Sequence, residues 1–77
     1  MKIKYLVVDI QTWDTGTITT PTYAYDNRNS AESKYHAILS TAAVTTLPCE
    51  AAVLMTSEGQ ILDHAMYRHE VEQPEES

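Results

Sequence analysis

One segment only, residues 30–46, has apolar residues at helical spacing, and this constrains the fold more than any other feature of the chain. Asn29 is expected to cap the helix, with Glu32 in the capping-box position, and Pro48 prevents it from continuing. The apolar stripe consists of Ala31, Tyr35, Ile38, Leu39 and Ala42. The rest of a folded core around this single helix must therefore be sheet.

Four segments have the β-branched and aromatic content of strands, and they are residues 2–13, 18–26, 50–57 and 60–69. Pro21 cannot donate to a ladder, so the second strand should lie at an edge or carry a bulge. Gly59 marks a tight hairpin turn between the last two strands. The order ββαββ predicts an α+β fold, with one helix on one face of a four-stranded, mostly antiparallel sheet.

Apolar side chains occur on both faces of the predicted strands. In residues 2–13, Tyr5 and Val7 point one way while Leu6 and Val8 point the other. In residues 60–69, the alternation places Leu62, His64 and Met66 on one face and Ile61, Ala65 and Tyr67 on the other. Since one helix covers one face, several hundred Å² of apolar surface would stay exposed, more than an ordinary monomer shows. We therefore expect a homo-oligomer, the alternative being a solvated amphipathic face.

Residues 1–69 are expected to form a single domain, and residues 70–77 an acidic, disordered tail. The formal charge of −6 disfavours binding to DNA or RNA backbones. Cys49 is the only cysteine, so no internal disulfide can form, and a reducing, cytoplasmic location is expected. Asp9 interrupts the apolar start, so we expect no signal peptide, and no run is long enough to span a membrane.

No residues form a recognisable catalytic or metal-binding pattern. Glu32 and His36 are spaced as an i,i+4 pair, which could be an ion pair or an acid–base pair, but no nucleophile accompanies them. His64 and His69, five residues apart, would lie on opposite faces of a strand. We expect neither an enzyme nor a metal or other cofactor.

The loop before the helix is the best candidate for a ligand site. Free backbone N–H groups at a helix N-terminus favour an anion, and Asn29 and Ser30 lie there. Arg28 adds a planar fork of donors suited to phosphate, and Lys34 lies one turn further on. The alternative is that Asn29 and Ser30 only cap the helix and that Arg28 is solvated or pairs with Asp26.

The aromatic residues are five tyrosines and one tryptophan, with no phenylalanine. Tyr23 and Tyr25 alternate onto one face of the second strand, and Trp13 ends the first. Tyr25 or Trp13 could stack on a base, since such rings offer a flat surface with a polar tip. The alternative is that they pack in the core or at an interface.

The run Tyr25-Asp26-Asn27-Arg28-Asn29-Ser30-Ala31-Glu32-Ser33-Lys34-Tyr35-His36, after the opening Tyr5-Leu6-Val7-Val8-Asp9-Ile10-Gln11, resembles a group of very small proteins encoded in phage and prophage regions of Gram-positive gut bacteria. The segment Ala31 to His36 is the most specific part. The resemblance implies a viral origin, and phage proteins of this size often counter host defence.

By analogy with phage nucleotide-signal sponges, we expect a non-catalytic, oligomeric protein that sequesters a cyclic nucleotide immune signal in the bacterial host's cytoplasm. Phosphate would meet Arg28, Asn29, Ser30 and Lys34. The alternative is a protein-interaction inhibitor or phage assembly factor that acts through the exposed sheet face or the acidic tail.

Overall fold

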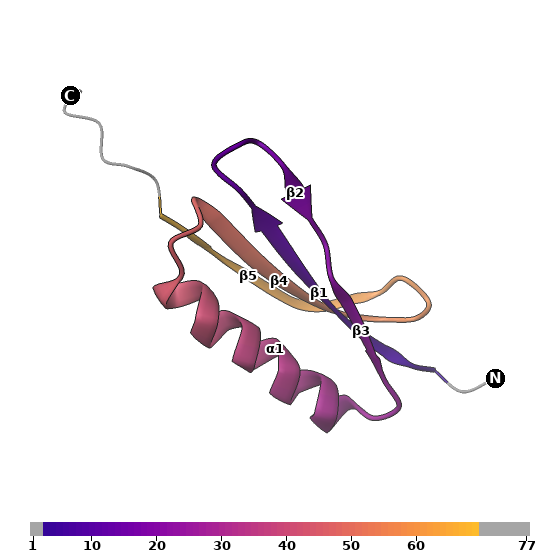
Figure 1. Cartoon of the computed structure of the whole chain (residues 1–77). Coiled ribbons are helices and arrows are strands. Elements are labelled where there is room, and N and C mark those ends of the chain that lie inside the picture. Colours follow the sequence, from indigo (N-terminus) through magenta and orange to yellow (C-terminus); the bar gives the residue numbers. More distant parts are fainter. Residues whose placement is uncertain (1–2, 70–77) are drawn as a thin grey trace.

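The structure, a computed structural model, describes residues 3–69 (Figure 1). The predicted acidic tail, residues 70–77, lies outside the described residues. The elements are β1 (Tyr5–Thr12), β2 (Ile18–Thr19), β3 (Thr22–Tyr25), α1 (Arg28–Val44), β4 (Cys49–Thr56) and β5 (Ile61–Arg68). The α+β prediction is confirmed, because one helix packs on one side of a single antiparallel sheet.

The sheet has five strands where the sequence predicts four. β1 pairs with β2 and β3 along one side and with β4 along the other, and β5 lies outside β4. The predicted strand 18–26 is split into β2 and β3, since Pro21 has no N–H for the ladder. The Pro21 carbonyl still accepts a hydrogen bond from the backbone N–H of Asp9 at 2.9 Å. The predicted interruption at an edge is thus present.

The helix begins two residues earlier than the sequence predicts. Asn27, with φ −130° and ψ 156°, is the N-cap, and its side chain accepts from the backbone N–H of Ser30 at 2.8 Å. The prediction that Asn29 is the cap is therefore wrong, because Asn29 lies inside the first turn. Glu32 does not form a capping box with it and instead pairs with Arg28.

The helix also ends earlier, at Val44 rather than residue 46. Thr45 is extended, with φ −71° and ψ 157°, so the chain leaves the helix before Pro48. The last carbonyls of a helix have no partner within it. One of them, that of Ala42, lies 2.7 Å from Nε2 of His69, which ties the end of the described chain to the helix.

The core lies between α1 and the sheet. Val7 of β1 and Ala52 and Leu54 of β4 are almost fully buried and pack against Ala31, Tyr35 and Ile38 of the helix. The small side chain of Ala31 lets the helix approach the sheet closely. Burial raises the pKa of the Tyr35 hydroxyl above its ordinary value, and the nearby Asp63 carboxylate adds to the rise.

A bulge in β5 changes the predicted faces of that strand. Leu54 pairs with Asp63 and Met55 with Ile61, so Leu62 is the extra residue. Leu62 packs against the core, whereas Ile61 shares a face with His64 and Met66. The prediction from simple alternation, that Leu62 lies on the same face as His64 and Ile61 on the opposite face, is therefore wrong.

Candidate functional site

The structure brings five of the six predicted ligand residues together at the N-terminal end of α1. Arg28, Asn29, Ser30 and Lys34 lie on its first two turns, and Tyr25 ends the strand that leads into it. Trp13 does not join them, because it lies beyond the other end of β1.

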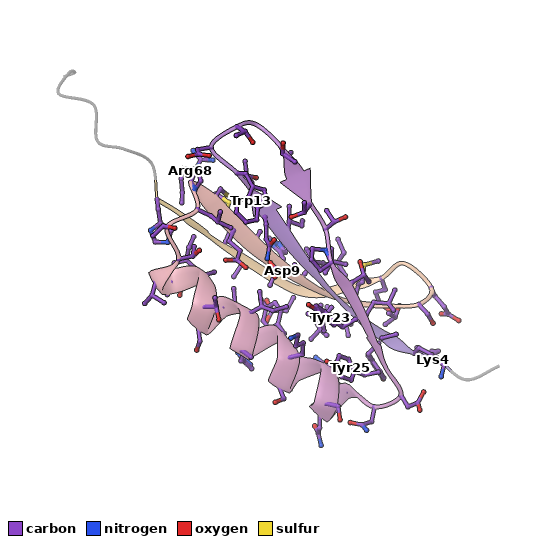
Figure 2. The ribbon with its side chains drawn as sticks, in the orientation of Figure 1. Lys4, Asp9, Trp13, Tyr23, Tyr25 and Arg68 are labelled. Atoms are coloured by element: carbon purple, nitrogen blue, oxygen red, sulfur yellow. The ribbon has the colours of Figure 1, made fainter. Side chains whose placement is uncertain are left out.

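Register places Trp13 at the other end of the sheet. Tyr25 pairs with Tyr5 at the start of β1, whereas Trp13 follows Thr12 at the end of β1. The seven steps of strand between Tyr5 and Thr12 span about 23 Å. Figure 2 shows Trp13 and Tyr25 well separated along the sheet.

The basic side chains at the helix entrance already have partners. Lys4 pairs with Asp26, and Nε of Arg28 lies 2.8 Å from a carboxylate oxygen of Glu32. The ammonium of Lys34 lies 4.2 Å from the ring centroid of Tyr23, a cation–π contact. Exposed ion pairs contribute only about 0–1 kcal/mol, so an anionic ligand could displace them.

The two tyrosines of β3 have different roles. Tyr25 is half-buried and packs against the core, which fits the packing alternative for it. Tyr23 is exposed beneath Lys34 and is the better placed of the two for stacking on a ligand.

The sheet face away from α1 is not covered by any helix of the described residues, and we call it the open face. Residues paired across an antiparallel ladder share a face. Val7 and Leu54 pack against the helix. The neighbouring positions Val8 and Val53 therefore point to the other face, where Val8 pairs with Val53 and Val53 with His64. The apolar residues of the open face include Leu6, Val8, Ile10, Ile18, Ala24, Ala51, Val53, Met55, Ile61 and Met66.

Charge is nearly absent from the open face. The strand carboxylates Asp9, Glu50 and Asp63 pair in register with helix-face residues, so none of them lies there. Arg68, at the end of β5, is the charged residue that shares this face. Ile61 and Met66, which both lie on this face, are 58% and 52% exposed.

Sequence reasoning missed a pocket between α1 and the sheet. It has a volume of about 180 Å³, and its walls come from β1, β4 and the middle of the helix. The lining residues are Asp9, Gln11, Lys34, Ala37, Ile38, Thr41 and Glu50. The signal for it was present in the alternation, because Asp9 and Glu50 occupy helix-face positions of their strands, next to core residues.

A chain of hydrogen bonds leads from Trp13 into this pocket. Trp13 Nε1 donates to Thr19 Oγ1 at 3.1 Å, and that hydroxyl donates to Gln11 Oε1 at 3.0 Å. Gln11 Nε2 then donates to Asp9 Oδ2 at 3.0 Å. The other carboxylate oxygen of Asp9, Oδ1, is buried without a hydrogen-bond partner. The chain therefore fixes the Asp9 side chain through one oxygen only.

The two carboxyl groups of the pocket are deeply buried, with Asp9 7% and Glu50 2% exposed. Burial and, after it, the neighbouring Asp9 raise the pKa of Glu50 to about 7, while a hydrogen bond from Gln11 opposes the rise. When Glu50 is protonated, its O–H can donate a hydrogen bond to Asp9, whose Oδ1 has no other partner.

No family model, curated protein or solved structure matches this chain. Within residues 3–69 there is no helix long and apolar enough to cross a membrane. The same residues hold no cluster of three or more His, Cys, Asp or Glu side chains that could bind a metal ion.

Proposed function

We propose that this chain is a non-catalytic binding protein that works as a homo-oligomer, and that the open face joins its copies. The observation that carries the proposal is the apolar, nearly uncharged surface formed by β1, β4 and β5 on the side away from α1. Buried sheet faces of this kind pack against one another about 10 Å apart in β-sandwiches.

A second copy suits the open face for three reasons. The face is central to the sheet and has the β-branched residues Val8 and Val53 at its middle, with larger side chains around them. The strand carboxylates lie on the helix face of the sheet, so two copies can meet through their open faces without bringing these negative charges together. A 77-residue chain also has a marginal core, which assembly would extend.

The size of the face is sufficient for assembly. β1, β4 and β5 have eight residues each, and β2 and β3 add six along the edge. At about 4.8 Å spacing and about 3.3 Å rise, they present about 480 Å² per copy. Two such faces together reach about 1,000 Å², the lower bound for a specific protein interface.

Sedimentation equilibrium tests this proposal. At micromolar concentration the mass should be at least twice the chain mass of 8.6 kDa. A mass of 8.6 kDa at every concentration up to the millimolar range would contradict it.

A second candidate function is the sequestration of a cyclic nucleotide immune signal, as the resemblance to phage proteins implies. The favouring observation is that three of the five basic residues, Lys4, Arg28 and Lys34, lie at one end of the fold with Tyr23. The carboxylate pocket does not suit this ligand, because it is acidic and smaller than the ~300–1,000 Å³ of ordinary ligand pockets. The nucleotide would bind on the outside of the helix entrance.

A thermal-shift screen against cyclic di- and trinucleotides tests the second candidate. A ligand at 100 times its Kd should stabilise the fold by about 2.7 kcal/mol. Replacing Arg28 with alanine should weaken binding by about 1.5–3 kcal/mol, because a charge-assisted hydrogen bond is lost. Equal binding by that variant would place the ligand elsewhere, and no shift with any nucleotide would reject the candidate.

A further inference from the structure

The pocket between α1 and the sheet has a chemistry that neither function above uses. Two carboxyl groups, those of Asp9 and Glu50, are each more than nine-tenths buried in its wall. From this arrangement we propose that the pocket binds a small organic cation, an ammonium or guanidinium group on a short apolar body, between Asp9 and Glu50. This inference does not depend on the proposed assembly.

The buried carboxylate of Asp9 requires a hydrogen-bond donor. A buried, unpaired carboxylate is strongly unfavourable, so such groups normally have a cationic or hydrogen-bonding partner. Gln11 satisfies Oδ2, whereas Oδ1 has no partner among residues 3–69. Lys34 lines the same pocket, but its ammonium lies over the Tyr23 ring. A donor from outside the chain would complete the site.

The remaining walls favour an organic cation over a metal ion. Ca²⁺ and Mg²⁺ need about six or more oxygen ligands, and residues 3–69 hold no cluster of three or more His, Cys, Asp or Glu side chains that could supply them. Ala37 and Ile38 provide an apolar surface for a short alkyl body, and the hydroxyl of Thr41 lies beside them. The volume of about 180 Å³ suits a molecule of a few heavy atoms rather than a nucleotide.

A proton competes with this cation. With Glu50 protonated, one hydrogen bond between the two carboxyl groups can satisfy Asp9 Oδ1 without a ligand. The charged or titratable groups around Glu50 are Asp9 on β1, Lys34 on α1 and Tyr67, its partner on β5. Because the pKa of Glu50 is about 7, the affinity for a cation should fall roughly tenfold from pH 8 to pH 6.

A titration of the ¹⁵N-labelled full chain with n-butylammonium chloride, followed by two-dimensional NMR at pH 8, tests the proposal. Saturable shifts are expected at the amides of Asp9, Gln11, Ala37, Ile38 and Glu50. Fluorescence of Trp13, the only tryptophan, gives a second readout through its hydrogen-bond chain to Asp9. Tetramethylammonium, which has no N–H donor, should bind at least tenfold more weakly, and butyrate should not bind.

Matched variants separate the pocket from general charge effects. Asp9→Asn and Glu50→Gln should each weaken butylammonium binding at least tenfold, while Asp14→Asn and Glu58→Gln, which neutralise exposed turn residues, should leave it unchanged. If a pocket variant fails to fold, the chemical-shift changes of the unaltered chain still test whether butylammonium binds in the pocket. The proposal is overturned by an absence of saturable shifts, by shifts that map elsewhere, or by equal responses to butylammonium and tetramethylammonium.

Discussion

Replacing Glu50 with glutamine should raise the free energy of unfolding at pH 8 by about 3 kcal/mol. Burial and Asp9 raise the pKa of Glu50 from its ordinary value of 4.5 to about 7. Each unit of difference in pKa between the folded and the unfolded chain corresponds to about 1.36 kcal/mol of free energy of unfolding. Glutamine keeps the shape of the neutral carboxyl group and can donate to the unpartnered oxygen of Asp9. It therefore removes the cost of ionising a buried acid.

The same shift fixes the direction of the pH dependence. The unfolded chain releases the Glu50 proton near pH 4.5 and the folded chain near pH 7, so the folded state binds more protons between these values. Stability from this group therefore falls as pH rises from about 4.5 to about 7, and the loss is complete above pH 7.

Urea denaturation of the parent and of Glu50→Gln at pH 5 and pH 8 measures both effects. The difference between the two proteins should be small at pH 5 and about 3 kcal/mol at pH 8. Glu58→Gln, at an exposed turn position, is the control and should match the parent at both pH values. A Glu50→Gln protein less stable than the parent at pH 8 would show that Glu50 is ionised and well solvated in the fold.

Replacing Val53 with glutamate should weaken assembly by at least about 100-fold, or about 3 kcal/mol, because a carboxylate would be buried in the interface without a partner. Val53 lies between Val8 and His64 in the middle of the open face. The same substitution at Val44, which is 80% exposed on the helix, is the matched control and should leave assembly unchanged. Sedimentation velocity over a concentration series compares the dissociation constants.

Two outcomes would argue against the open face as the interface. If Val53→Glu assembles as tightly as the parent, the copies meet elsewhere, for example along the free edge of β5. If Val44→Glu dissociates the copies as strongly as Val53→Glu, added negative charge alone is responsible. Circular dichroism of both variants must first show the parent's secondary structure.

Much of the fold could be predicted because its signals are local. The apolar stripe around Tyr35 and Ile38 predicted the helix, and alternation in residues 2–13 predicted that Leu6 and Val8 point away from Val7. Pro21 predicted an interrupted edge strand for the same physical reason that splits β2 from β3, its missing N–H. The first two features follow from side-chain periodicity and the third from the missing N–H of proline, and all three can be read from a few neighbouring residues.

Other features depend on geometry that short-range patterns do not specify. Asn27 and Asn29 are equally good caps by residue type, and the position at which the chain turns after β3 decides between them. The bulge at Leu62 changes the face of Ile61 without a glycine or proline to mark it.

The candidate sites were harder to predict than the fold, because they depend on register. Trp13 was grouped with Arg28 by chemistry, although β1 separates them by its whole length. The pocket at Asp9 and Glu50 joins residues forty-one positions apart, and only the pairing of β1 with β4 brings them together.

An isotope-filtered NOE experiment on a mixture of ¹³C-labelled and unlabelled chains tests the central claim, that the open face joins two copies, most directly. Intermolecular NOEs are predicted among the methyl groups of Leu6, Val8, Val53 and Met55, with none to Val44 on the exposed helix surface. Intermolecular NOEs confined to α1 or to the outer edge of β5, or none at millimolar concentration, would contradict the account.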